Sequence, residues 1–299
     1  MIALLQIEAA GESCLGDSTF DFYWQHQGSR LNPDKPVCSG ISYRKIVEAL
    51  RLGETVKISG NAGSRLGSSL GVDLMRLGGR GGPLEGTGRI VVDGDVGSRM
   101  GISMLRSAIY VSGKVEPPLG NVLEQESDLS GYRKFISITE ALEKGLPVLE
   151  PNLQDDRGLA ISDGLLRDTL GARNPADGVI RLKGDAGMST GILMHSGRIE
   201  VSGSTGCNTG VLLRGGRIVV RGSTGDFTGA EMRGGEIFVA DDAGSYACAK
   251  IRGGAVYARR GKPLPPAKAH QPSSSEQTLL ARTLEISPLY AMMYQKFSL

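Results

Sequence analysis

The chain has 299 residues, which is enough for one large domain or two ordinary ones, and 40% of them are hydrophobic. Its 44 glycines, about twice the usual share of roughly 7%, come without a G-X-Y triplet, so collagen is excluded, and the hydrophobic content excludes a disordered glycine-rich chain. The 34 basic and 32 acidic residues give a formal net charge of +2, which indicates neither nucleic-acid binding nor an acidic tail.

Residues 1–52 are predicted to form a region that caps the following fold. The stretches "ALLQIEA" and "FDFYW" are typical of strands, and "SYRKIVEALRLGE" is typical of a helix with Ser42 as its N-cap. The apolar start of the chain is interrupted by Glu8, too early for a signal peptide or an anchor. No apolar run reaches about 18 residues, so we expect a cytoplasmic protein without a membrane span.

The four cysteines are scattered and contain no C-x-x-C pair. A long chain without a signal peptide needs no disulfide framework, so reduced thiols are expected. They are Cys14, Cys38, Cys207 and Cys248.

Residues 53–113 carry one glycine pattern twice, at a step of 34 in residue number. The matching glycines are Gly60, Gly63 and Gly67 in the first copy and Gly94, Gly97 and Gly101 in the second. This step equals a basic step of 19 lengthened by an insertion at 71–85, "GVDLMRLGGRGGPLE". In the second copy Ser107 stands where a glycine is expected.

Residues 114–178 break the pattern and are predicted to form an irregular excursion that decorates the fold or separates its two parts. "SITEALEKGLP", from Ser137, predicts a short helix that ends at Gly145 and Pro147. "DGLLRDTLGA", at 163–172, predicts a second helix.

From residue 179 to residue 260 the same unit recurs at a fixed step of 19 in residue number. Glycine occupies complete columns at Gly187, Gly206, Gly225, Gly244 and at Gly197, Gly216, Gly235, Gly254, and a third column, Gly191, Gly210, Gly229, ends at Cys248. The apolar columns are Met194, Leu213, Met232, Ile251, then Ile199, Ile218, Ile237, Val256, then Val201, Val220, Val239, Ala258. About two units precede residue 114, and about four follow residue 179.

This pattern predicts an all-β fold, a parallel β-solenoid (β-helix) that spans residues 53–260. The I-x-V tract alternates with period two, and a coil of about 19 residues is too short for a helix pair or a propeller blade, which need roughly 34 to 45. Stacked coils about 4.8 Å apart would turn each column into a ladder, with the methionine and leucine column inside. The glycines are then expected at corners that need positive φ or leave no room for a Cβ.

Residues 261–299 are predicted to form a Pro- and Ser-rich linker, a helix and an apolar tail. The linker is "GKPLPPAKAHQPSSSEQ", and the helix follows in "SSEQTLLARTLEI". The tail "SPLYAMMYQKFSL" is expected to dock onto the end of its own solenoid or onto a partner.

No catalytic, cofactor-binding or metal-binding residue is predicted. Neither a P-loop nor a Rossmann fingerprint occurs, and the aspartate column of calcium-binding β-rolls is missing. The histidines, His26, His195 and His270, lie far apart in sequence, with no zinc-site spacing among them and the cysteines. Cys207 has no evident base beside it, and Cys248 occupies a glycine column, so both are interpreted as structural.

One column consists of polar cations on the predicted outer face. It contains His195, Arg214, Arg233 and Arg252. Like charges about 4.8 Å apart repel each other unless acidic groups nearby neutralise them. Either local acids such as Glu231 do so on a solvated face, or the column is a docking strip for an acidic partner surface or a polyanionic ligand.

The repeat unit resembles that of the GXGXG family, found in the glutamate synthase large subunit and in the C-type subunit of formylmethanofuran dehydrogenase. The resemblance covers Ile180–Arg259, with "GDAGMSTGILMHSGRIEVSG" and "GAEMRGGEIFV" as its most specific lines, and more loosely Lys57–Gly113. In length and as a free-standing chain, the sequence is more similar to this C-type subunit than to glutamate synthase.

The resemblance implies a right-handed β-helix that serves as a non-catalytic structural subunit in the first step of methanogenesis from CO2. The molybdenum or tungsten pterin, the iron–sulfur clusters and the dinuclear metal site would then lie on partners, including a pterin-binding and an amidohydrolase-like subunit. The related C-type subunit of the bacterial formyltransferase/hydrolase complex is the alternative. A carbohydrate-acting β-helix is a remote one, because the acidic residues form no columns.

Overall fold

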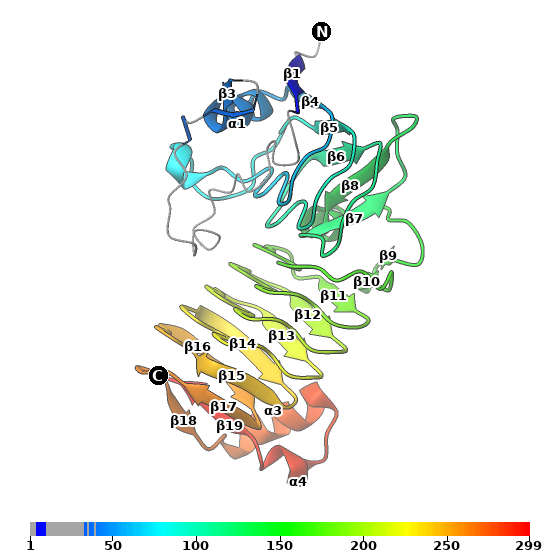
Figure 1. Ribbon diagram of the computed structural model, residues 1–299. Coiled ribbons are helices and arrows are strands. Elements are labelled where there is room, and N and C mark those ends of the chain that lie inside the picture. The colour runs from blue at the N-terminus through cyan, green and yellow to red at the C-terminus, as the bar shows by residue number, and fades with distance from the viewer. Residues whose placement is uncertain (1–3, 10–32, 35, 39) are drawn as a thin grey trace. The chain divides into compact units, whose positions relative to one another are not determined.

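In a computed structural model of the protein, the chain divides into two compact units (Figure 1). Unit 1 comprises Met1–Ala141 with Pro147–Leu149, and unit 2 comprises Leu142–Leu146 with Glu150–Leu299. The structure describes residues 4–9, 33–34, 36–38 and 40–299. Each unit is built on stacked parallel strands, so the predicted β-solenoid is confirmed. The division between the units falls inside the predicted excursion.

Unit 1 contains a six-stranded sheet of order β1-β4-β5-β6-β8-β7. The strands are β1 (Leu4–Glu8), β4 (Thr55–Ser59), β5 (Ile90–Asp93), β6 (Ala108–Val111), β8 (Arg133–Ser137) and β7 (Val122–Gln125). The first four are parallel, and β8 and β7 add antiparallel pairs at one edge. Val56 lies opposite Ile90, and Ile90 opposite Ile109, which confirms both predicted steps in unit 1. The insertion holds the 3-10 helix η2 (Met75–Leu77).

The predicted N-terminal helix is present as α1 (Tyr43–Arg51). The Ser42 side chain accepts a hydrogen bond from the Lys45 backbone N–H at 3.4 Å, which makes it the predicted N-cap. The buried face of α1 packs Ile46 and Leu50 into the core of unit 1. A short hairpin of β2 (Pro36–Cys38) and β3 (Ile41–Ser42) precedes it. The predicted "FDFYW" strand and His26 lie outside the described residues.

Unit 2 contains a nine-stranded sheet of order β18-β19-β16-β14-β13-β12-β11-β10-β9. The strands are β9 (Leu153–Asp155), β10 (Gly158–Ile161), β11 (Val179–Leu182), β12 (Arg198–Val201), β13 (Arg217–Val220), β14 (Arg233–Val239), β16 (Gly253–Ala258), β18 (Lys268–His270) and β19 (Gln295–Ser298). The strands from β10 to β16 are parallel, and β9, β19 and β18 close the two edges antiparallel. β15 (Asp242–Ala247) and β17 (Arg260–Pro263) form a separate parallel pair.

The predicted ladders form the interior of unit 2. The isoleucine ladder runs through Ile180, Ile199, Ile218, Ile237 and Val256, and each of these residues lies opposite the next. Figure 1 shows its strands stacked one below another, from green β11 to orange β16. Every member of this ladder is fully buried. The column of Met194, Leu213, Met232 and Ile251 is buried as well, which confirms its interior position.

The glycine columns occupy corners for the two predicted reasons. Gly216 has φ +78, and a Cβ there would lie 2.7 Å from the carbonyl oxygen of Gly197 on the preceding coil. Two residues that replace glycine at a corner also adopt a positive φ. Ser107, in a glycine position of unit 1, adopts φ 79, and Cys248, in a glycine column of unit 2, adopts φ 56 while fully buried.

The predicted helix at 163–172 is wrong. Thr169 and Gly171 have φ of 57° and +67°, which an α-helix cannot contain, and the segment turns a corner of a coil. That coil begins with β10, where Leu159 lies opposite Ile180. The excursion at 114–178 is therefore shorter than predicted, and the coils of unit 2 begin before residue 178. The other predicted helix, α2 (Ile138–Lys144), is confirmed.

The C-terminal region is more ordered than the predicted linker. The stretch "GKPLPPAKAHQPSSSEQ" contains the end of β17 and all of β18, and Ala267 is buried. The predicted helix is α3 (Ser274–Leu284), and the short α4 (Pro288–Ala291) follows it. The tail docks onto its own solenoid, since β19 pairs with β16 and Phe297 is fully buried.

A polar cluster fixes α3 to the sheet. Glu276 accepts hydrogen bonds from Lys296 Nζ at 2.7 Å and from the Tyr257 hydroxyl at 3.0 Å, and its other oxygen accepts the backbone N–H of Ser273 at 2.8 Å. The bond from Lys296, with those from Ser273 and Tyr257, lowers the pKa of Glu276 to about 2. Helix α3, β16 and β19 are thus joined through one ionised carboxylate.

Replacing Gly216 by Ala is expected to lower the free energy of unfolding by more than the roughly 1–2 kcal/mol that positive φ costs an L-residue, because the added Cβ also meets the Gly197 carbonyl. Gly164→Ala is the matched control, since Gly164 has φ +73 and an added Cβ meets nothing within 4 Å. Chemical denaturation of both variants measures the difference. If Gly216→Ala and Gly164→Ala lose equal free energy of unfolding, the close approach of the coils at Gly216 is contradicted.

Glu276→Gln is expected to flatten the acid dependence of stability. The lowered pKa of Glu276 means that its contribution is present above about pH 4.5 and is lost as the pH falls towards about 2. Unfolding followed between these values should therefore show a steeper loss for the unmodified chain than for Glu276→Gln. Glu285→Gln, which removes an exposed carboxylate just beyond the same helix, controls for the loss of a negative charge.

Candidate functional site

The structure brings the four predicted docking residues together as one exposed column, here named the cationic strip. It consists of His195, Arg214, Arg233 and Arg252, all exposed. Each arginine follows an interior leucine, methionine or isoleucine and is held by a ladder hydrogen bond to the preceding coil. These bonds are Arg214 N–H to Met194 O at 2.9 Å, Arg233 N–H to Leu213 O at 2.7 Å, and Arg252 N–H to Met232 O at 2.8 Å. The strip therefore advances by one residue per coil.

The positive charges of the strip are not neutralised by acidic side chains within the described part of the chain. Arg214, Arg233 and Arg252 form no ion pair with any described residue, and neither does Glu231, the local acid offered as a counter-charge from the sequence. Arg217, three residues after Arg214 in the sequence, behaves differently, because it pairs with Glu236 of the next coil at 2.6 Å. At the ladder spacing of about 4.8 Å, neighbouring charges repel by about 1 kcal/mol even in water.

His195 holds the first guanidinium of the strip. Arg214 Nη1 lies 3.2 Å from His195 Nε2, and because an arginine can only donate, the imidazole accepts through Nε2 and carries its proton on Nδ1. Partial burial of the ring, followed by the charges of Arg214 and Arg173, lowers the pKa of His195. At neutral pH His195 is therefore an uncharged acceptor that orients Arg214.

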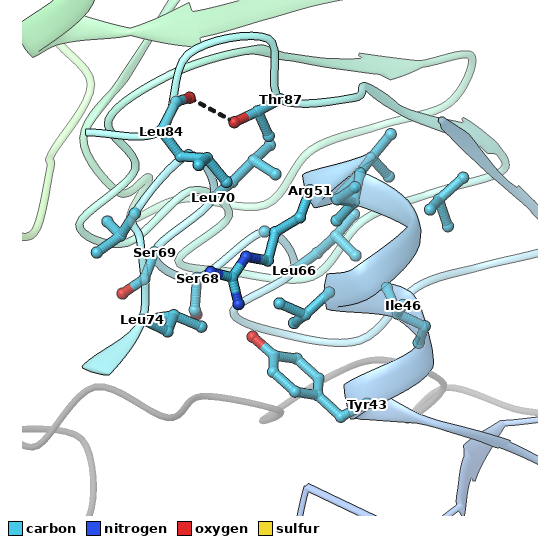
Figure 2. Close-up of a pocket in the computed structure, with 17 residues that line it drawn as sticks. Tyr43, Ile46, Arg51, Leu66, Ser68, Ser69, Leu70, Leu74, Leu84 and Thr87 are labelled. Carbon is cyan, nitrogen blue, oxygen red and sulfur yellow. Dashed lines mark hydrogen bonds between the residues drawn. The ribbon is translucent and has the colours of Figure 1, made fainter. Parts of the chain in front are cut away.

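A second feature, an apolar cavity of about 50 Å³ in unit 1, was not predicted from the sequence. Figure 2 shows Tyr43, Ile46 and Arg51 of α1 on one side, and on the other Leu70 with Leu74 and Leu84, the last two from the inserted loop. Arg51 pairs with Asp73 at 2.7 Å, and the Thr87 hydroxyl donates to the Leu84 carbonyl at 2.6 Å. The cavity is far below the roughly 300–1,000 Å³ of ligand pockets, so it suits a single apolar side chain.

Two aromatic rings form an exposed pair that the sequence reasoning also missed. Phe227 and Tyr246 stack with ring centroids 4.9 Å apart, and both are exposed. They occupy one column of the repeat, after Ser189 and Asn208, which share their positive φ. Because Phe227 and Tyr246 stand one full step apart in the sequence, the repeat alone was a sufficient signal for this pair.

The structure describes the side chains of two cysteines, Cys207 and Cys248. Cys248 is buried, and loss of solvent raises the pKa of its thiol to about 12, while Cys207 is exposed in a turn. Both are free thiols. Cys14 and the Cys38 side chain lie outside the described residues. The burial of Cys248 in a glycine column supports its interpretation as a structural residue.

Neither a metal cluster nor a membrane helix occurs in the parts of the chain that the structure describes. No three His, Cys, Asp or Glu side chains of residues 4–9, 33–34, 36–38 and 40–299 are grouped so that they could hold a metal ion. Among the helices formed by these residues, none has both the length and the apolar character to cross a bilayer.

Comparison with known proteins identifies a relative without an assigned role. An uncharacterized protein of Methanothermobacter thermautotrophicus is 45% identical over 199 residues, which are 66% of this chain and 65% of that relative. The chain thus spans less than two thirds of the length of the protein that it matches. No family model matches the chain, and no solved structure matches it. The name of the relative assigns no activity.

Arg214→Ala is expected to raise the pKa of His195 towards its ordinary value of 6.5, because it removes the nearest positive charge. The resonance of the His195 ring, followed by NMR while the pH is lowered, measures this shift. Arg252→Ala, two coils further along the strip, is the control and should shift the pKa of His195 less. An unchanged pKa in Arg214→Ala would show that the contact between the two side chains is not formed in solution.

Proposed function

We propose that this chain is a non-catalytic scaffold subunit that binds an acidic partner surface along the cationic strip. The observation that carries the proposal is the set of three stacked, exposed arginines without an ion pair in the described part of the chain. Their mutual repulsion is a local cost that a partner with carboxylates would convert into attraction. Such a surface favours association and orientation of a partner.

The rigidity of the coils supports the scaffold role. The backbone atoms of the strip are fixed by ladder hydrogen bonds, and the coil beneath them is filled by the buried isoleucine and methionine columns. A surface held in this way loses little conformational entropy when it binds, in contrast to a loop. The glycine columns occupy corners between stacked coils, which supports the interpretation of the repeat as a scaffold.

Within this role, we propose the C-type subunit of the formylmethanofuran dehydrogenase complex as the specific assignment. The support is the resemblance of the repeat over Ile180–Arg259 to the GXGXG family. The chain would then position subunits that carry the pterin, the iron–sulfur clusters and the dinuclear metal site, and it would itself hold no cofactor. Its location would be the cytoplasm.

Arg214→Glu combined with Arg233→Glu is expected to reduce the recovery of partner subunits at least about tenfold, because two attractive contacts become repulsive. The full chain carries an affinity tag in the cells that make it, and the co-purifying chains are quantified by mass spectrometry. Arg80→Glu with Arg157→Glu is the matched control, since both arginines are exposed and the net charge changes equally. Equal recovery from both variants would contradict docking through the strip.

The same purification tests the specific assignment. A pterin-binding subunit and an amidohydrolase-like subunit should co-purify with the tagged chain, together with formylmethanofuran dehydrogenase activity in the complex. A different set of partners, lost in the double variant, would keep the scaffold role and contradict the dehydrogenase. A formyltransferase among the partners would favour the bacterial hydrolase complex.

A further inference from the structure

We infer that the partner element bound by the cationic strip is an acidic α-helix that lies along the stack of coils and presents carboxylates at positions i, i+4 and i+7. The inference rests on the proposed scaffold function and specifies the kind of surface that the strip recognises. It follows from the spacing of the arginines and from the shape of the surface beside them.

The spacing of the strip matches a helix better than an extended chain. Ladder hydrogen bonds connect the coils, so Arg214 and Arg252 are two coil steps apart, or about 9.6 Å along the stack. In an α-helix, residues i, i+4 and i+7 lie on one face and span about 10.5 Å. Alternate residues of a strand advance about 6.7 Å each, so three of them span roughly 13 Å and fall out of register. Three carboxylates on a helix can therefore face three arginines at once.

The surface beside the strip lets a helix approach closely. Each arginine is followed by a glycine, and these are Gly215, Gly234 and Gly253. An added Cβ at Gly234 would lie 2.6 Å from the carbonyl oxygen of Arg214, and one at Gly253 equally close to that of Arg233, so the stacking of coils itself excludes side chains here. The strip is therefore bordered by bare backbone along its length.

The glycine border widens into an open hollow at the C-terminal end of the strip. Gly235, Gly253 and Gly254 line this hollow, with Glu236 and Lys296 among its polar groups. Both polar groups are already paired, Glu236 with Arg217 at 2.6 Å and Lys296 with Glu276 at 2.7 Å. The charged side chains Glu236, Glu276 and Lys296 of the hollow are thus engaged in ion pairs, and the hollow provides room for the body of a helix.

The length of the strip distinguishes a protein helix from a long polyanion. At the N-terminal end of the strip stands His195, which is uncharged at neutral pH. On the coil before it, the Asn174 carbonyl accepts the His195 backbone N–H at 2.9 Å, so the equivalent position is Pro175, which carries no charge. The row of fixed charges thus covers only about two turns of a helix. A nucleic-acid or polyphosphate site would gain from a longer row, because affinity for such ligands grows with each phosphate neutralised.

The test measures binding of defined probes to the full chain by fluorescence anisotropy at low salt. The main probe is a stapled helical peptide with glutamates at i, i+4 and i+7, and its control has the same composition with the glutamates distributed around the helix. An extended peptide with glutamates at alternate positions and inorganic polyphosphate form the two remaining arms. We expect the aligned helix to bind at least about tenfold more tightly than each of the other three.

The contribution of the strip is measured with Arg214→Ala, Arg233→Ala and Arg252→Ala combined in one chain. This variant should lose the preference for the aligned helix, while Arg80→Ala, Arg157→Ala and Arg282→Ala combined should keep it, since these arginines are exposed elsewhere. Circular dichroism and thermal unfolding verify that both variants are folded.

Several results would overturn the inference. Equal or tighter binding of the extended peptide or of polyphosphate would assign the strip to another ligand, and equal binding of the two helical peptides would remove the register argument. Binding that survives in the strip variant would place the site elsewhere. If the helix fails while the charge-reversal variant still loses its partner subunits, the scaffold role stands and only the helical partner is wrong.

Discussion

The parallel backbone ladder between successive coils is the constraint on which the structure of unit 2 depends. Because the chain returns to the same place at every step of the repeat, each side chain lies above the equivalent residue of the coil before. The ladder sorts residues by position: isoleucine at the inward strand positions, glycine where φ is positive or a neighbouring carbonyl is close, and arginine on one outer edge. Burial, turn geometry and surface charge all follow from this one periodicity.

The same periodicity is favourable inside and unfavourable on the cationic strip. Stacked isoleucines exclude water and pack with one another, whereas stacked arginines accumulate like charge at the ladder spacing. At one nearby outer position the conflict is avoided, because Arg217 and Glu236 place opposite charges on adjacent strands. The strip lacks this compensation within the described residues, and this contrast distinguishes it from the neighbouring pair of Arg217 and Glu236.

The sequence predicts the fold well wherever the step is regular and fails where it changes. The columns from Gly187 onward predict both the buried ladders and the exposed strip. The coil that contains β10 was missed because the step from Leu159 to Ile180 is longer than the regular one, as is the step from Gly171 to Gly191, so a fixed period skips it. The contact of His195 with Arg214 needs side-chain rotamers, and the cavity of unit 1 needs the path of the inserted loop, which no periodicity specifies.

The central claim, that the cationic strip is a covered interface in the assembled protein, is tested most directly by arginine-selective labelling. The assembly purified from its natural cells and the isolated chain are treated with phenylglyoxal, and the modified arginines are quantified by mass spectrometry. Arg214, Arg233 and Arg252 should react in the isolated chain and be protected in the assembly, while Arg80 and Arg157 react equally in both. Equal reactivity of the three strip arginines in both samples would contradict the account.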